Sequence, residues 1–437
     1  MAKSKKKAYI ALGLTGAALL IVALVVLAAR FLYKPKMSTA HENRATDIVA
    51  DDSEIRIPQP LPERTSFVIP RLKALDAPLV NSGKIMLGTS IPKTGELGLA
   101  GRGLSDGLFL FLNKTNTVDH GVWRTCSVSL DQRDDSGLVA RALPHVYDLL
   151  SKSPLFLAPA GDIVFEKVYF PLLRQGAIAV FFPAVGLRQE NVDELPVVWF
   201  RPSYALEVAA LIKYALRSLK VSKMAVFYEE SAWGLEAKKA AEAVLKKENG
   251  CALCASASYQ PNTVTIQGAV SEIKKTAPQV VLCLAGGRAT YNFIREALNQ
   301  QMHAVSYLGL SRTAAVAPQL KKARGVTLFT ASVVPNPHKS QLPIVASYRT
   351  FMQRYLPNKG LSTESLEGYI AASLFIYFCS LLSPRASAGD LMKLIKQPRE
   401  ILFKGLRLYY KNHSLSSAVW INGGVDMVWD EWGGEDA

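Results

Sequence analysis

Residues 219–234 read LKVSKMAVFYEESAWG, and this stretch decides the fold. Its residues 224–228 form a short apolar run, which is typical of a strand buried on both faces. Residues 229–234 form a polar turn, and residues 235–248 then repeat apolar side chains at helical spacing until Asn249-Gly250 stops the helix. A buried strand followed by such a helix predicts a parallel sheet with covering helices, in which ligands bind at the carboxyl ends of the strands.

Similar strand-helix pairs lie on both sides of this stretch. Beyond it, strands are predicted at 251–259, 280–284, 305–310 and 327–331, between helices at 235–248, 264–275, 289–300 and 313–321. Before it, strands are predicted at 84–90, 124–131, 155–158 and 177–181. Helices are predicted at 104–113, 137–150 and 204–219, and a further helix follows the third strand and ends at 173. Two more helices (345–356 and 364–382) and two short strands (407–410 and 417–421) complete the pattern. The predicted fold class is α/β, with two doubly wound parallel-sheet lobes.

The N-terminal segment has the composition of a membrane anchor. Residues 8–29 carry no charge, and four lysines precede them, so we predict a basic cytoplasmic tip at 1–7 and a single-pass transmembrane anchor at 8–33. This orientation places the rest of the chain outside the cytoplasmic membrane. A cleaved signal peptide is the alternative, although its apolar region is usually shorter. Residues 34–81 contain repeated prolines and are predicted to be a linker.

Charge and cysteine content exclude several classes of protein. The formal net charge is +15, of which residues 1–36 supply +7, and the remaining +8 is spread without a Lys/Arg block, which argues against nucleic-acid binding. The five cysteines are an odd, dispersed set that does not predict a disulfide framework. Cys251 and Cys254 have CxxC spacing, but they fall in a predicted strand rather than at a helix N-terminus. No pair of histidines has metal-ligand spacing, and we predict neither a metal nor a cofactor.

Short motifs in a fixed order give the chain a family resemblance over residues 82–425. They are Pro92-Lys-Thr-Gly95 after the first strand, Ala158-Pro159, Phe200-Arg201, the stretch from Met224 to Trp233-Gly234, and Gly368-Tyr369 with Ala371. In these marks the chain resembles the type I periplasmic binding proteins, in their leucine/isoleucine/valine-binding branch. The resemblance implies two lobes that close on a small ligand like a clamshell, formed by residues 82–202 with 333–408 and by 203–332 with 409–437. It also implies delivery of the ligand to an ABC-type permease.

The resemblance further implies a set of ligand-binding residues in the cleft. Trp233 stands in the position of the stacking aromatic, and the loops after the strands contribute Thr94, Asp162, Ala184, Val185, Arg288 and Arg312. Val185-Gly186 replaces the hydroxyl-bearing pair of the family, and Ser311-Arg312 stands where the family has an acid for the ammonium group. An arginine there disfavours an amino-acid zwitterion. Purely structural roles stay open for these residues. Trp233 could pack within its own lobe, and Arg312 could be a solvated loop arginine. Gly286-Gly287 could form a tight turn rather than bind an anion.

The sequence therefore predicts a membrane-anchored, extracytoplasmic solute-binding protein for a small amino-acid-like or anionic solute, not an enzyme. The alternative is a ligand-sensing or ligand-less regulatory ectodomain that acts through contacts with other envelope proteins. An anchored glycosyltransferase is disfavoured, because the chain shows no convincing acidic metal motif or nucleotide-phosphate loop.

Overall fold

The computed structural model describes residues 73–188, 192–248, 250–261, 263, 265–422 and 429–432. The predicted basic tip, the anchor and residues 34–72 of the predicted linker lie outside these ranges. Within the described ranges, no helix has both the length and the apolar character needed to cross a membrane. The described end of the linker packs on the protein, because the 3₁₀ turn η1 (Ala74–Asp76) is followed by a backbone hydrogen bond from Leu79 to Ala386.

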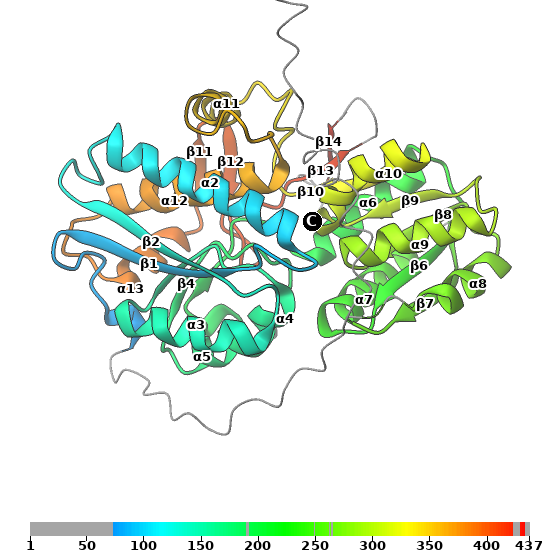
Figure 1. Ribbon diagram of the computed structural model, residues 1–437, viewed down its shortest axis with the longest axis horizontal. Helices are drawn as coiled ribbons and strands as arrows, with labels where there is room; N and C mark the ends of the chain where they lie inside the picture. The colour runs from blue at the N-terminus through cyan, green and yellow to red at the C-terminus, as the bar shows by residue number, and fades with distance from the viewer. Residues whose placement is uncertain are drawn as a thin grey trace, which may run out of the picture. The chain divides into compact units, whose positions relative to one another are not determined.

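The first lobe is built on a five-stranded parallel sheet in the order β2-β1-β3-β4-β5. Its strands are β1 (Lys84–Ile91), β2 (Ser127–Asp134), β3 (Leu155–Leu157), β4 (Ala179–Phe181) and β5 (Val197–Val198). Figure 1 shows helices on both sides of these strands, with α2 (Gly98–Thr117) and α12 (Thr363–Ser380) on one side and α3 (Val139–Lys152) and α5 (Phe170–Arg174) on the other. The doubly wound arrangement predicted for this half is confirmed.

Several shorter elements complete the first lobe. Between β3 and α5, α4 (Asp162–Val164) leads into the π-helical turn η2 (Phe165–Tyr169), and the 3₁₀ turn η3 (Val192–Glu194) precedes β5. The C-terminal part adds α11 (Pro343–Tyr355), α13 (Ala388–Ile395) and the hairpin of β11 (Glu400–Phe403) and β12 (Leu406–Tyr409). Four elements, α13, β5, β11 and η3, were not predicted from the sequence.

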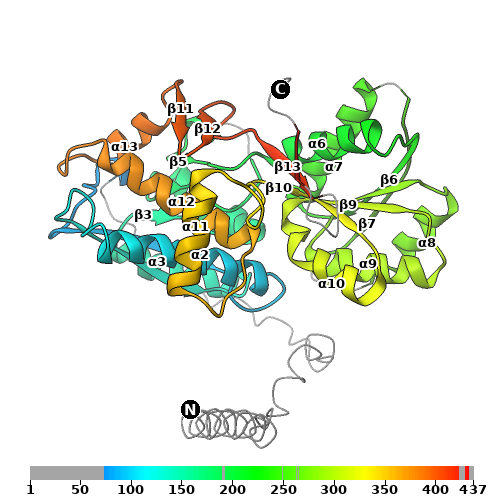
Figure 2. The same ribbon diagram turned by 90° about the horizontal axis from the view of Figure 1, so that it is seen from above.

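The second lobe is built on a seven-stranded sheet in the order β14-β13-β10-β9-β8-β6-β7. The predicted parallel strands are β6 (Lys223–Glu229), β7 (Ala252–Tyr259), β8 (Val280–Leu284), β9 (Ser306–Gly309) and β10 (Leu328–Ser332), and β13 (Val419–Asn422) and β14 (Trp429–Trp432) extend them antiparallel. In Figure 2, α6 (Tyr204–Arg217) and α7 (Ala232–Lys247) cover one face, and α8 (Gln267–Lys275) and α9 (Gly287–Asn299) cover the other. After β9 the chain forms the 3₁₀ segment η4 (Ser311–Val316) and α10 (Ala317–Arg324).

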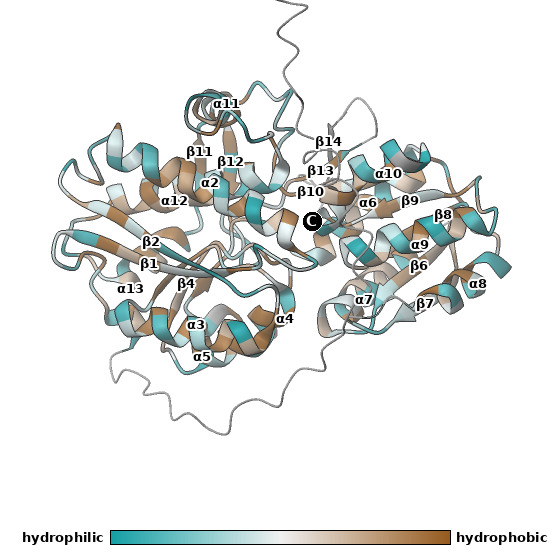
Figure 3. Cartoon of the chain, in the orientation of Figure 1, coloured by the Kyte–Doolittle hydropathy of each residue, from teal (hydrophilic) through white to brown (hydrophobic). Residues whose placement is uncertain are grey.

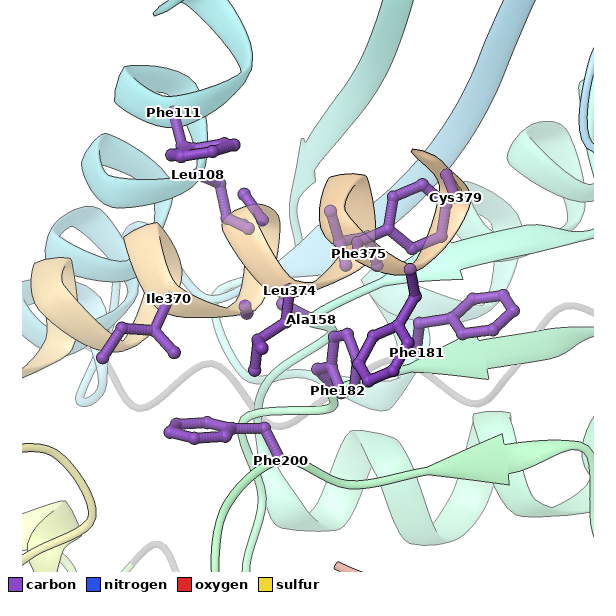
Figure 4. Packing of buried hydrophobic residues seen from close by; sticks show 14 of the residues in the cluster. Leu108, Phe111, Ala158, Phe181, Phe182, Phe200, Ile370, Leu374, Phe375 and Cys379 are labelled. Carbon is purple, nitrogen blue, oxygen red and sulfur yellow. The ribbon is translucent and has the colours of Figure 1, made fainter. Parts of the chain in front are cut away.

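Apolar side chains fill the space between the sheets and their helices. Figure 3 shows mainly hydrophobic residues along the central strands. One cluster combines α2 and α12 with the first sheet, and within it Phe181 meets Phe375 edge-on with ring centroids 5.3 Å apart (Figure 4). Another cluster joins α3 and α5 of the first lobe to α6, α7 and one face of the second sheet. A buried seam therefore runs from one lobe into the other and fixes the elements that carry the candidate site.

Helices α2 and α12 cross at two glycines. A Cβ atom on Gly107 would lie 1.9 Å from the carbonyl oxygen of Ser365, and one on Gly368 would lie 2.3 Å from the carbonyl oxygen of Leu104. No side chain fits at these distances, so the two backbones are in direct contact. The contact holds the N-terminal end of α12 beside the cleft described below.

Candidate functional site

Three of the seven predicted ligand-binding residues line one small cavity between the lobes. Asp162 and Ala184 reach it from the first lobe, and Arg312 reaches it from the second. The cavity has a volume of about 80 Å³. Drug-sized ligands occupy pockets of roughly 300–1,000 Å³, so this space as it stands holds only a few water-sized groups.

Arg312 bridges the two lobes. It follows β9, in the first turn of η4, and its Nη1 donates to Asp162 Oδ2 of the first lobe. Its guanidinium carbon lies 3.8 Å from the centroid of the Trp233 ring. Burial lowers the pKa of the Arg312 guanidinium, but Asp162, together with Tyr204, Glu229 and Tyr259, outweighs burial, so the pKa is raised overall. The Nε atom of Arg312 is buried and has no hydrogen-bond partner among the residues that the structure describes.

Asp162 is held in place by its own lobe and by Tyr204. The aspartate begins α4 directly after Gly161, whose φ of +94° lets the chain turn there. The hydroxyl of Tyr204 lies 3.0 Å from each carboxylate oxygen of Asp162, and Asp162 is only 6% exposed. A buried carboxylate needs such partners, and here they come from Arg312 and Tyr204.

Trp233 is buried beneath Arg312 and does not line the cavity. It is 1% exposed, its Nε1 donates to Glu229 Oε1 at 2.8 Å, and its ring lies 5.5 Å from that of Tyr204. In this structure Arg312 covers the face of the ring on which a solute was predicted to stack, and stacking of Trp233 on a solute stays a prediction. The cation of Arg312 covers the ring face, because a guanidinium is attracted to the electron-rich face of an indole.

Three other predicted residues lie away from the cavity. Val185 is fully buried in the core that joins the lobes, so its side chain cannot line a cleft. Thr94 is exposed, and its hydroxyl is tied to its own lobe by donating to Asp134 Oδ2 at 2.8 Å. Arg288 is exposed in the first turn of α9. The structure does not bring these three side chains to the cavity, and their role in ligand binding stays a prediction.

The glycine turn before α9 faces a carboxylate of the protein itself. A Cβ atom on Gly286 would lie 2.6 Å from Oε1 of Glu96, which belongs to the other lobe. A helix N-terminus favours a negative group, so Glu96 meets the preference that was predicted for an external anion at Gly286-Gly287. The glycine allows this close approach between the lobes.

A buried network of ion pairs and hydrogen bonds, which was not predicted from the sequence, holds the residue next to Arg312. Arg201 is 5% exposed and contacts Glu207 Oε1 at 2.8 Å and Glu367 Oε1 at 3.2 Å. Glu207 in turn accepts from the backbone N–H of Ser311 at 2.8 Å and from the Ser311 hydroxyl at 3.0 Å. Burial opposes the charge of Arg201, but the two glutamates raise its pKa overall. The network joins both lobes and fixes the residue directly before Arg312.

Glu236 of α7 is a second contact between the lobes, and its pKa is raised to about 7 by burial. The backbone N–H of Arg188 donates to it and the Arg188 guanidinium attracts it, which both lower the pKa, whereas the charge of Asp162 raises it. The folded protein thus holds this proton more tightly than the unfolded chain, where the pKa is 4.5. Stability is therefore lost as pH rises through this interval.

We expect Glu236→Gln to remove that loss. Between pH 5 and pH 8, the free energy of unfolding of the wild type should fall by about 1–2 kcal/mol relative to that of the variant. This is less than the full pKa shift of Glu236 implies, because solvent screens a partly exposed side chain. Urea unfolding at both pH values measures this difference. Glu242→Gln, on the same helix but half exposed and paired with Lys238, should behave as wild type. Equal pH dependence in all three proteins would contradict the prediction.

A larger cleft adjoins the small cavity at Thr363 and Glu364, which line both. Its volume is about 730 Å³. Apolar walls come from both lobes, namely from Leu99, Leu361, Ala314, Ala315, Pro318 and Leu328. The charged lining is mainly basic, with Arg102, Lys321, Lys322 and Lys359 against Asp106 and Glu364. This cleft has the size and composition of a small-molecule site with an anionic preference.

The sequence of both lobes matches a known protein family. A family model described as a periplasmic binding protein matches residues 84–379, more than half of the chain. The chain belongs to the type I periplasmic binding protein family. Within this family it is of the leucine/isoleucine/valine-binding type. Leu/Ile/Val-binding protein homolog 7 of Brucella melitensis is 29% identical over 218 residues, which cover 46% of this chain and 52% of that relative. The match thus spans about half the length of the curated relative.

Solved structures of this family share the fold. A possible leucine/isoleucine/valine-binding protein from Rhodopirellula baltica superposes with a TM-score of 0.71 at 20% identity, covering 82% of this chain and 97% of that one. The branched-chain amino acid transporter substrate-binding protein LivJ of Streptococcus pneumoniae, in complex with isoleucine, gives 0.66 at 11% identity, covering 79% and 98%. At these identities the likeness shows the periplasmic-binding-protein fold alone.

Proposed function

We propose that this protein is an extracytoplasmic solute-binding protein that captures a small solute with an apolar body and an anionic group. The observation that carries the proposal is the cleft of about 730 Å³, whose walls come from both lobes and whose charged lining is mainly basic. In the family, lobes that close around a solute gain their closing energy from contacts with it. The streptococcal relative was solved in complex with isoleucine, which supports a solute about as small as an amino acid.

The proposal extends to partners and to location. An ABC-type permease in the same membrane would receive the solute, and residues 8–33 would anchor the protein with its globular part outside the cytoplasm. The chain is proposed to act by binding and release, not as an enzyme. Arg312 in place of the family's acid supports an anionic group rather than an ammonium group on the solute.

A thermal-shift screen of the full-length protein tests the proposal. Monocarboxylates with apolar bodies are expected to raise the unfolding temperature by several degrees, because a ligand at a hundred times its dissociation constant stabilises the folded state by about 2.7 kcal/mol. Uncharged amides of the same carbon skeleton are the control and should give smaller shifts. The absence of any stabilising solute across carboxylates, amino acids and amides would overturn the proposal.

A second candidate function is supported by the Arg312–Asp162 ion pair. This pair joins the lobes through the protein's own side chains, as expected if the fold served as a ligand-less regulatory ectodomain. Crosslinking of the full-length protein in its own membrane separates the two functions. A stable envelope-protein partner together with an empty solute screen would favour the regulatory role, whereas a permease partner would favour transport.

A further inference from the structure

The guanidinium of Arg312 is only partly used by the protein. An arginine side chain offers five N–H donors in a planar fork that matches a carboxylate through two parallel hydrogen bonds. Here Nη1 donates to Asp162, while the buried Nε finds no partner within the described part of the chain. A buried donor left unpaired is costly, so this edge of the guanidinium is unsatisfied in the structure as it stands.

The surroundings of Arg312 fix the plane of this fork. The Trp233 ring lies against the guanidinium, at 3.8 Å between the ring centroid and Cζ. Glu229 holds that ring in turn by accepting from its Nε1 at 2.8 Å, and Glu207 holds the backbone N–H of Ser311 at 2.8 Å. The Arg312 guanidinium is thus held in one orientation against the Trp233 ring, and Arg312 is not a solvated loop arginine.

The group that pairs with Arg312 has the same chemistry as the proposed solute. Asp162 supplies a carboxylate from the opposite lobe, and Tyr204 can continue to bond it at 3.0 Å if Arg312 turns to another acceptor. The cavity that both residues line lies next to the apolar cleft, because Thr363 and Glu364 line both spaces. A carboxylate head group at Arg312 would therefore leave an apolar body in the cleft between Leu99, Leu361 and Ala315.

We propose that Arg312 is the carboxylate receptor of this site and that Asp162 is its internal competitor, which an incoming monocarboxylate displaces. The inference rests on the proposed solute-binding function and adds the residue that selects the solute. A free amino acid is a poor ligand in this arrangement, because its ammonium group would lie beside the same cation without the family's acid. The favoured class is a monocarboxylate with an apolar body and no second charge.

Calorimetric titration of the full-length protein with hexanoate and phenylacetate tests the inference, with hexanamide and phenylacetamide as uncharged controls. Asp162→Asn keeps the shape but removes the competing charge, so both carboxylates should bind about tenfold more tightly than to wild type. The amides should gain nothing. Arg312→Gln should weaken carboxylate binding by about tenfold or more, and Arg312→Lys should fall between, since it keeps the charge without the fork. Asp148→Asn, an exposed aspartate of α3, should bind as wild type.

The gain in affinity is the decisive readout, because a variant that merely folded poorly could not bind more tightly. Carboxylate binding that neither Asp162→Asn nor Arg312→Gln alters would overturn this inference and leave the proposed function standing. Failure of both carboxylates to bind wild type and Asp162→Asn alike would count against both.

Discussion

Replacing Glu207 by glutamine is expected to lower the free energy of unfolding by about 3 kcal/mol, the magnitude seen when one partner of a buried ion pair is removed. Glu207 is fully buried and pairs with Arg201, which is itself 5% exposed. The amide keeps one acceptor, but it leaves the Arg201 cation with Glu367 as its remaining carboxylate, at 3.2 Å. Chemical unfolding in urea measures the change.

The same substitution should also disturb the candidate site. Both the N–H and the hydroxyl of Ser311 donate to Glu207, so the amide loosens the residue that precedes Arg312. Carboxylate binding in the calorimetric titration should therefore weaken together with stability. The matched control is Glu272→Gln in α8, which is exposed and should change stability by less than about 0.5 kcal/mol. A Glu207→Gln protein as stable as this control would show that the ion pair contributes nothing.

The predictable part of the fold comes from strands that are buried on both faces. Residues 280–284 were predicted as a strand and form β8 with these bounds, because five consecutive apolar side chains are typical of a parallel strand that is covered on both faces. The start of α2 was predicted six residues too late, at 104 instead of Gly98, because Gly98 and Gly101 resemble loop residues. The structure gives the reason for Gly101, since a Cβ atom there would lie 1.9 Å from the carbonyl oxygen of Pro92.

The site was harder to predict than the fold, because its contacts join distant parts of the chain. Arg312 and Asp162 are 150 positions apart, and Arg201 and Glu367 are 166 apart. Motif order placed the loops that carry Asp162 and Arg312 correctly, but no local pattern indicates that one side chain neutralises the other. The resemblance likewise located Trp233, while the covering of its ring by Arg312 joins two residues of the second lobe that lie far apart in the sequence.

The contact between α2 and α12 leads to the second large prediction. Gly107→Ala is expected to lower the free energy of unfolding by about 2–3 kcal/mol, the range seen when a packed interior is overfilled. Helix propensity alone predicts the opposite sign, since alanine is favoured over glycine inside a helix by about 1 kcal/mol. The steric effect should win, because the new Cβ would lie 1.9 Å from the Ser365 carbonyl oxygen, and a backbone atom cannot swing aside as a side chain can.

Gly268→Ala provides the matched control for this argument. Gly268 also lies in a helix, α8, but a Cβ atom there would meet no atom of the described residues within 4 Å. Propensity then acts alone, and the variant should equal or exceed the wild type in stability by up to about 1 kcal/mol. Urea unfolding of the two variants side by side should therefore give changes of opposite sign. If Gly107→Ala proved as stable as Gly268→Ala, the helices would have room to separate, and the N-terminus of α12 would not be fixed beside the cleft by this contact.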